Sequence, residues 1–222
     1  MGYLGSKAAS GAYQAIIANM PAHELYIEAF LGTGVIFNKK PQAIRSIGIE
    51  LDELTLSEFR PVYPIELHNQ DTLDFLTAFD FKSPTNTFIY ADPPYLPDTR
   101  TSSKRYRKEL TIEQHIELLV QFKYLSERGV KIMLSGYPSE LYDSQLTDWR
   151  TYEFNVMTRG GVRREKLWMN YEADCLHWSA YAGVNFTDRQ RIKRKAKRWA
   201  KNYQALDPKE RLAVLAAMME VK

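Results

Sequence analysis

The chain has 222 residues, 45% of them hydrophobic and 26% charged, which is the composition of an ordinary soluble globular protein with one substantial domain and an appendage. Its single cysteine excludes an intramolecular disulfide, and its four scattered histidines indicate no metal site. The sequence has no apolar run of ~18 residues and no signal-peptide pattern, which favours a cytoplasmic location without a membrane partner. The net charge of +3 is uneven, because residues 188–201 hold eight Lys/Arg and one Asp and so carry +7, which leaves −4 for the remainder. Such local basicity indicates a polyanionic partner.

Short apolar runs alternate with helical patterns, which predicts an α/β fold with a mostly parallel sheet. We expect a catalytic domain over residues 1–182 and a basic helical extension over 183–222. In chain order the sequence predicts a helix over 11–20 and then strands over 24–30, 46–51, 64–71 and 87–92. A helix over 111–129, capped by Thr111 and Gly129, precedes a strand over 130–138. Antiparallel strands over 152–158 and 166–172, joined by 159–165, precede a helical tail from Thr187 and a second helix near Asp207.

Acids and glycines recur where the first four predicted strands end. Ligands of open parallel sheets bind outside the carboxyl ends of the strands. One acid in such a place commonly caps a turn or helix, whereas four in succession indicate a site. The residues concerned are Glu28 with Gly32 and Gly34, then Glu50, Asp71 and Asp92.

Three of these positions suit a bound nucleoside. Glu50 stands where nucleotide-binding folds commonly hold a ribose diol. Asp71 could accept a hydrogen bond from an adenine amine or could cap the helix that follows it. The two glycines of "LGTG" permit close approach of a ligand, but they fit a simple tight turn equally well.

The stretch "DPPY", Asp92 to Tyr95, is the most specific signal in the sequence. Pro93 and Pro94 fix two φ angles, so that an Asp92 oxygen and the Pro93 carbonyl can converge on one amino group. The ring of Tyr95 offers a face for a planar base. An amine on an aromatic ring is a poor nucleophile, and two acceptors that bond both of its hydrogens would free its lone pair. The stretch therefore favours activation of an exocyclic amine.

At these residues the sequence resembles the Dam-like family of S-adenosylmethionine (SAM)-dependent DNA adenine-N6 methyltransferases. The matching motifs follow the family's order over nearly all of residues 1–172. They are "YLGSK" (3–7), "EAFLGTG" (28–34), "IGIELD" (47–52), "NQD" (69–71), "DPPY" with the loop after it, "LSGYPSELY" (134–142) and "EKLWMNY" (165–171).

The resemblance implies a Rossmann-like class I methyltransferase fold, with a mostly parallel sheet, an antiparallel late strand pair and a C-terminal helical tail. It implies SAM as the cofactor and double-stranded DNA as the partner, with the target adenine flipped out. Asp92, Pro93, Pro94 and Tyr95 would form the catalytic motif, in which Tyr95 stacks on the extruded base. The implied cofactor contacts are Tyr3, Lys7, Glu28, Phe30, Gly32, Gly34, Glu50 and Asp71.

The sequence departs from the longer members of this family in one respect. Only some 40 residues separate Glu50 from Asp92, which leaves no room for a helical target-recognition domain. We therefore expect DNA contacts from a basic loop, a basic turn and the tail, although the tail helix could equally be solvated. The candidates are Arg100, Lys104, Arg105, Arg163, Arg164, Arg191, Lys193 and Arg194.

The same chemistry leaves other functions open. An RNA adenine or a DNA cytosine-N4 amine could be activated in the same way, whereas a protein glutamine target is less favoured because such enzymes prefer Asn in place of Asp92. A catalytically inactive nucleic-acid-binding module is an alternative from another class, and the intact "DPPY" argues against it. The sequence leaves the target sequence and the oligomeric state open.

Overall fold

A computed structural model describes residues 7, 11–81, 86–96, 108–158, 161–173, 181–183 and 185–220 of the chain. The chain divides into two compact units, Met1–Trp178 and Ser179–Lys222. Each unit is described by itself. No helix within the described ranges is long and apolar enough to cross a membrane.

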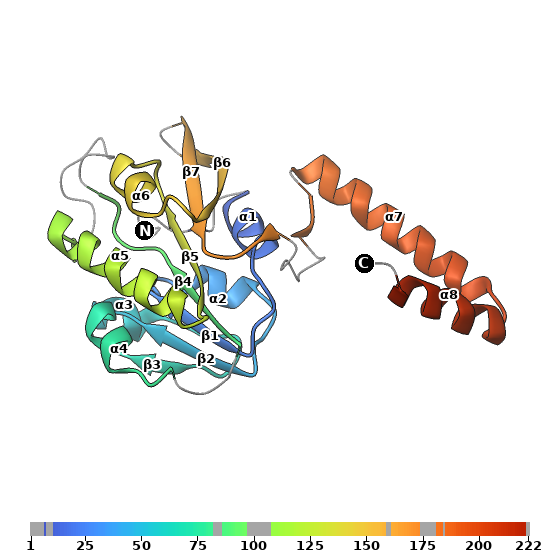
Figure 1. Ribbon diagram of the computed structural model, residues 1–222, viewed down its shortest axis with the longest axis horizontal. Helices are drawn as coiled ribbons and strands as arrows, with labels where there is room; N and C mark the ends of the chain where they lie inside the picture. Colours follow the sequence, from blue (N-terminus) through green and yellow to red (C-terminus); the bar gives the residue numbers. More distant parts are fainter. Residues whose placement is uncertain are drawn as a thin grey trace. The chain divides into compact units, whose positions relative to one another are not determined.

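Unit 1 is built on one seven-stranded sheet with the order β3-β2-β1-β4-β5-β7-β6 (Figure 1). All neighbouring strands pair in parallel except β7, which runs antiparallel to both β5 and β6. This arrangement confirms the predicted Rossmann-like class I methyltransferase fold and its late antiparallel pair. The strands are β1 Leu25–Ala29, β2 Arg45–Ile49, β3 Glu66–His68, β4 Thr87–Ala91, β5 Lys131–Gly136, β6 Arg150–Thr158 and β7 Gly161–Met169.

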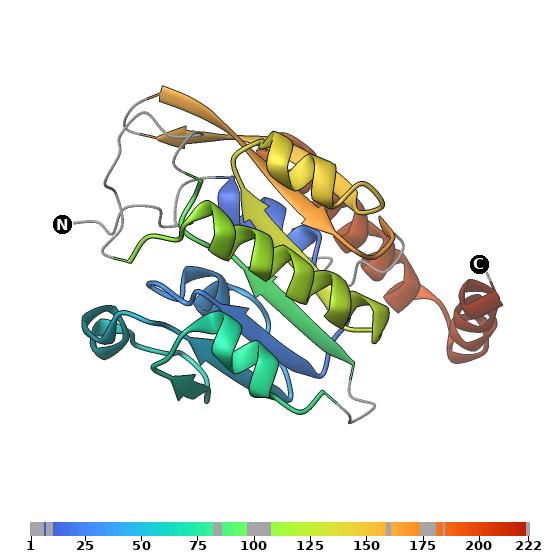
Figure 2. The same cartoon turned by 60° about the vertical axis from the view of Figure 1, so that its left-hand side comes forward.

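Helices cover both faces of this sheet. Figure 2 shows α5 crossing one face between α4 and α6, with α1 behind the strands. Three helices of five or six residues were not predicted, because so short an element completes barely one period of an apolar pattern; these are α2, α3 and α6. The helices of unit 1 are α1 Ala12–Ala18, α2 Val35–Lys39, α3 Glu53–Glu58, α4 Thr72–Ala78, α5 Ile112–Glu127 and α6 Glu140–Gln145.

The two faces of the central strands carry different side chains, since successive residues of a strand point to opposite faces. On one face Ile27, Ile89 and Leu134 join the main apolar cluster with Leu118 and Phe122 of α5. On the other face lie side chains with polar ends, of which Tyr26, Tyr90 and Ser135 are fully buried. The acids Glu28 and Asp92 flank this second set, so the polar face of the sheet leads directly to the predicted site.

The antiparallel pair departs from its predicted bounds. Residues 159–165 were expected to form a loop, but β7 begins at Gly161, whose register partner on β6 is Thr158. Residues 161–165 therefore belong to a strand. The basic residues among them obscured the alternation, since both faces of an exposed ribbon accept charge. Arg163 and Arg164 are strand residues and not turn residues.

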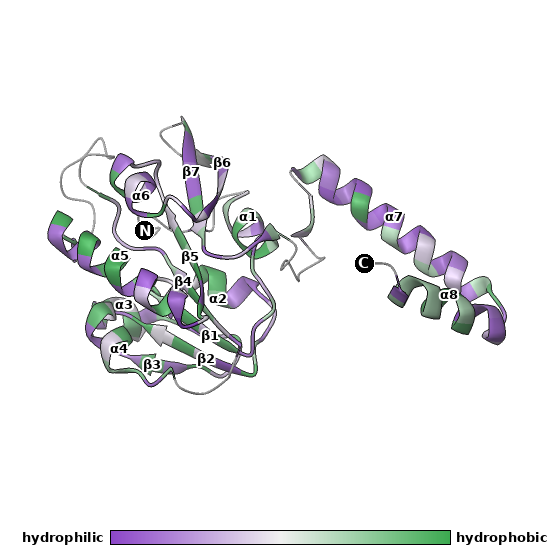
Figure 3. Cartoon of the chain, in the orientation of Figure 1, coloured by the Kyte–Doolittle hydropathy of each residue, from purple (hydrophilic) through white to green (hydrophobic). Residues whose placement is uncertain are grey.

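Unit 2 consists of two helices, α7 Phe186–Ala205 and α8 Pro208–Glu220. Asn185 caps α7, so the helix begins one residue before the predicted Thr187, and Asp207 accepts from the backbone N–H groups of Lys209 and Glu210 as expected. Neither helix contains a buried residue. Figure 3 shows α7 as mostly hydrophilic, whereas hydrophobic residues are frequent along α8.

Candidate active site

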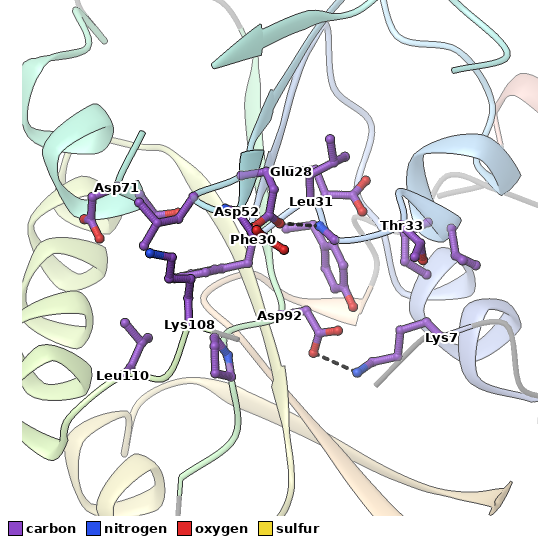
Figure 4. Close-up of a pocket in the computed structure, with 18 of the residues that line it drawn as sticks. Lys7, Glu28, Phe30, Leu31, Thr33, Asp52, Asp71, Asp92, Lys108 and Leu110 are labelled. Atoms are coloured by element: carbon purple, nitrogen blue, oxygen red, sulfur yellow. Dashed lines mark hydrogen bonds and ion pairs between the residues drawn. The ribbon is translucent and has the colours of Figure 1, made fainter. Parts of the chain in front are cut away.

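A pocket lies at the carboxyl ends of β1, β2 and β4, where the sequence predicts a site (Figure 4). Lys108 and Leu110 border it on the side of α5, and Lys7 borders it on the opposite side. Its lining combines buried acids with apolar side chains. The lining residues are Lys7, Glu28, Phe30–Thr33, Val35, Ile36, Glu50–Asp52, Asp71, Thr72, Tyr90, Asp92, Pro94, Lys108–Leu110 and Gln114.

The loop after β1 has a strained backbone. Phe30 has a φ of 71°, in a region that bulky residues rarely adopt. Such strain costs roughly 1–3 kcal/mol and tends to occur at ligand sites. Gly34 also has a positive φ, but it is not among the residues that line the pocket. Its Cα faces the ring of Phe59, since a Cβ on this residue would lie 2.1 Å from that ring. Gly32 lines the pocket, and Gly34 lets the loop pack.

Glu50 fastens this loop to the end of β2. Its Oε2 accepts from the Gly32 N–H at 2.8 Å, and its Oε1 accepts from the Asp52 N–H at 2.8 Å. Burial raises the pKa of Glu50, and the two backbone N–H groups oppose that rise. Each carboxylate oxygen keeps one further acceptor position, so Glu50 can hold the loop and a ligand hydroxyl together.

Asp71 is the N-cap of α4, which confirms one of the two roles predicted for it. Its Oδ1 accepts from the N–H groups of Leu73 at 2.7 Å and Asp74 at 3.3 Å. The residue also lines the pocket and is half-buried. Capping fixes the side chain without consuming the second oxygen, so both predicted roles are compatible.

Glu28 is a buried acid in the wall of the pocket. Burial raises its pKa to about 8, against the hydrogen bond from Tyr26 Oη at 2.8 Å and the charge of Lys40. Burial likewise lowers the pKa of Lys40 to about 8. A carboxyl group so placed is a ready partner for a cationic group in the pocket.

Asp92 directly follows β4 and stands at the centre of a polar network. Its Oδ1 accepts from Lys7 Nζ at 2.7 Å and from Ser135 Oγ at 2.8 Å. Ser135 is in turn 3.0 Å from Tyr90 Oη. The side chain of Asp92 is 17% exposed, so it is fixed from behind by these groups and still reaches the pocket. Sequence reasoning missed Ser135, although the "LSGY" motif that contains it was identified.

Tyr95 takes part in the same network. Its hydroxyl accepts a hydrogen bond from Lys7 Nζ, and the ammonium lies 4.8 Å from the centroid of the ring. The ring meets Tyr137 edge-on at a centroid distance of 4.4 Å. Arg163 Nη1 donates to Tyr137 Oη at 3.1 Å. Tyr95 is buried and does not line the pocket, so a base could stack on it only after these neighbours move.

The predicted DNA contacts fall in several places. Arg100, Lys104 and Arg105 lie outside the described residues, as does Tyr3, which was predicted as a cofactor contact. Arg164 is exposed beside Glu153 at 3.5 Å, and Arg163 is half-buried against Tyr137, so these two neighbours differ in their availability to a phosphate. The tail candidates are all exposed on α7; they are Arg191, Lys193 and Arg194.

The structure groups no metal ligands together within its described residues. His115 is fully buried on α5, with Nδ1 2.8 Å from Tyr142 Oη. It is a core residue.

The chain is similar to several solved structures and to a curated sequence. The solved structures include a precorrin 8w decarboxylase from Methanobacterium thermoautotrophicum (11% identity, TM-score 0.49, 77% of this chain and 97% of that chain). They also include a SAM-dependent methyltransferase from Agrobacterium tumefaciens (12% identity, TM-score 0.46, 71% of this chain and 58% of that chain).

Among curated proteins, the Type II methyltransferase M1.LlaDCHI of Lactococcus lactis subsp. cremoris is 32% identical over 78 residues. The match covers 34% of this chain and 28% of the relative, so the chain spans less than a third of that protein. Residues 66–163, from β3 into β7 and including "DPPY", match the family of D12 class N6 adenine-specific DNA methyltransferases, and over this segment the resemblance predicted from the motifs is confirmed.

Proposed function

We propose that this chain transfers a methyl group from SAM to the N6 amine of an adenine flipped out of double-stranded DNA. The observation that carries the proposal is the position of Asp92. It closes β4 beside a pocket into which three neighbouring strand ends bring Glu28, Glu50 and Asp71. The match of residues 66–163 to an adenine-specific family supports the choice of amine.

The residues of the pocket fit SAM. Glu50 and Asp71 retain carboxylate oxygens for a ribose diol and an adenine amine, and the strained loop at Phe30 and Gly32 presents backbone to the ligand. Glu28 complements a cationic group, which suits a cofactor that carries both an ammonium and a sulfonium. When bound, SAM supplies an electrophilic methyl group.

Asp92 and the Pro93 carbonyl activate the target. Each accepts one hydrogen of the amine, which draws the nitrogen toward a tetrahedral geometry and makes its lone pair available. The diproline removes two backbone donors from the neighbourhood of these acceptors. Lys7 and Ser135 keep the Asp92 side chain from rotating. Catalysis here is preorganisation, without a covalent intermediate on the protein.

The tail supplies a surface for the phosphate backbone. Arg191, Arg194, Lys195 and Arg198 follow one another at helical spacings, so they share one face of α7. All are exposed. Lys and Arg that contact phosphates release counterions and bind without regard to sequence. This face is suited to hold DNA while another element selects the adenine.

The experiment is incubation of the purified chain with methyl-labelled SAM and matched double-stranded DNA, single-stranded DNA and RNA, followed by mass spectrometry of the nucleosides. We expect N6-methyladenine from duplex DNA. N4-methylcytosine, or product from RNA alone, would assign the alternative substrates. SAM binding by calorimetry with no product from any substrate would contradict the proposal, and absence of SAM binding would favour the inactive module.

A further inference from the structure

Glu165 on β7 is a buried acid that does not line the pocket. It is 7% exposed, and its Oε2 lies 3.5 Å from Lys7 Nζ. Lys7 is itself 4% exposed and lies between this carboxylate and Asp92. A buried cation between two carboxylates is costly to assemble unless its contacts are well formed. The arrangement joins the N-terminal segment, β4 and β7 at one ammonium group.

We propose that Lys7, backed by Glu165, is a positioning residue that holds the Asp92 side chain in the orientation that presents it to the target amine. The inference rests on the proposed function, since it assigns Asp92 to that amine. It differs from the cofactor contact that the family resemblance implies for Lys7. Glu165 has the supporting part, because it touches Lys7 and not Asp92.

The hydrogen bonds to Asp92 define this orientation. Oδ1 accepts from Lys7 Nζ and Ser135 Oγ, at 2.7 and 2.8 Å. These two donors occupy the acceptor positions of one carboxylate oxygen. Figure 4 shows Asp92 bonded to Lys7 through one oxygen, with the other turned away from it. The second oxygen is thereby left for the amine.

The charges that face Lys7 define its protonation. Although burial lowers the pKa of Lys7, the facing carboxylates raise it well above its ordinary value, so the ammonium persists at every working pH. Burial raises the pKa of Glu165, and Lys7 opposes that rise. Lys7 is thus the one cation that lies against both carboxyl groups among the described residues. The titratable groups that face Asp92 are Lys7, Glu28, Tyr90, Tyr95, Tyr142 and Glu165.

Removal of Lys7 leaves two carboxylates without their cation. One of them then takes up a proton at a higher pH, because like charges and burial both favour the neutral form. For Lys7→Met we expect the acid limb of the pH profile of kcat to move up by about 1–3 pH units, with activity returning as the pH rises. Lys7→Arg, which keeps the charge, should stay closer to the wild-type profile.

The second variant removes the other carboxylate. In Lys7→Met/Glu165→Gln the second of the two carboxylates that faced Lys7 is gone, so the acid limb should move back toward that of the wild type. Glu165→Gln alone keeps the contact between Lys7 and Asp92. For this variant we expect less than about a tenfold loss of kcat with little change in KM. The matched control is Lys39→Met, an exposed lysine on α2 that lines no part of the pocket.

The measurement is kcat and KM from pH 5 to 9 for the wild type and these variants, with thermal melting to confirm that each is folded. A loss in Lys7→Met that is equal at every pH, or an acid limb that the double variant leaves in place, would overturn the inference. Wild-type chain without methyl transfer would instead contradict the proposed function. In that event the pH dependence of melting still decides, because Lys7→Met should lose stability as pH rises and the double variant should lose less.

Discussion

The strand-end pocket of unit 1 and the helix α7 of unit 2 both concentrate charge, but they do so in opposite ways. In the pocket, single acids are buried or half-buried, and donors hold them in place, as two backbone N–H groups hold Glu50 and as Lys7 and Ser135 hold Asp92. On α7, eight cations lie within 14 residues and no residue of the helix is buried.

The difference indicates how each region works. Charges in a low-dielectric environment interact strongly and act through geometry, so that each one matters singly. Charges in water are screened and act through their number. We therefore expect single substitutions to disable the pocket and grouped substitutions to be needed on the helix.

The largest effect is expected for Asp92→Ala. Loss of a preorganised acceptor should reduce turnover on the order of 10²–10³-fold. SAM affinity, measured by calorimetry, should stay nearly unchanged, because Asp92 serves the amine. Asp148→Ala, an exposed acid in the turn before β6, is the control. A variant with more than about a tenth of wild-type turnover would remove Asp92 from its assigned role.

Gly34→Ala tests the packing of the loop after β1. The change places a Cβ against the ring of Phe59 in a residue whose φ is 61°. Overpacking and backbone strain together should lower the free energy of unfolding by roughly 3 kcal/mol. The matched control is Gly129→Ala, where φ is 83° and no atom lies within 4 Å of the added Cβ. Strain alone should cost about 1–2 kcal/mol there. Equal losses of unfolding free energy for the two variants in denaturant melts would show that the Phe59 ring moves aside at little cost.

Glu28 offers a test of burial by pH. Its folded pKa of about 8 lies above the ordinary value of 4.5, so its contribution to stability is complete below pH 4.5 and is lost as pH rises toward 8. Glu28→Gln should remove this dependence, which is worth on the order of a few kcal/mol. The measurement is melting temperature from pH 4.5 to 8, and an unchanged slope would show that the pKa of this carboxyl group is not raised by burial.

The sequence predicted the parts of the site that local chemistry specifies. Strand-end acids and "DPPY" could be placed because parallel strands deliver their carboxyl ends to one edge of the sheet. Glu165 and Ser135 could not, because their roles depend on which strands become neighbours of β4. The order of β5 and β7 beside it is a tertiary outcome that no local pattern encodes. The buried position of Tyr95 was missed for the same reason, since Tyr137 and Lys7 reach it from distant segments.

Substitutions of Tyr95 distinguish contacts of its ring face from contacts of its hydroxyl. Tyr95→Ala removes both the ring and the hydroxyl that accepts from Lys7, and loss of stacking should weaken binding of the flipped base by roughly 1–3 kcal/mol. Tyr95→Phe removes only the hydroxyl, and we expect a smaller loss, of less than about tenfold in kcat/KM. Steady-state kinetics on duplex DNA measure both. If Phe proved as damaging as Ala, the hydroxyl and not the ring face would carry the function of Tyr95.

The smallest effect per residue is expected on α7, where the charges act by number. Removing one cation that binds a phosphate should change the slope of log affinity against log salt by about 0.9. Replacing Arg191, Arg194 and Lys195 together by Gln should therefore flatten the slope by up to about 2.7 and weaken specific and nonspecific duplexes alike. SAM affinity should not change, because the lining of the pocket contains no residue of α7. The measurement is duplex affinity by anisotropy over a range of salt.

A triple variant of exposed residues on α4 and α5, Thr77→Ser, Glu113→Gln and Glu117→Gln, keeps the number of substitutions equal without removing a cation. This control variant should show the same slope of log affinity against log salt as the wild type. Parallel slopes for the wild type and the α7 variant would show that these cations remain in solvent when DNA binds. In that case other cations must hold the phosphate backbone. Of the predicted contacts in the described part of unit 1, Arg164 is the exposed one.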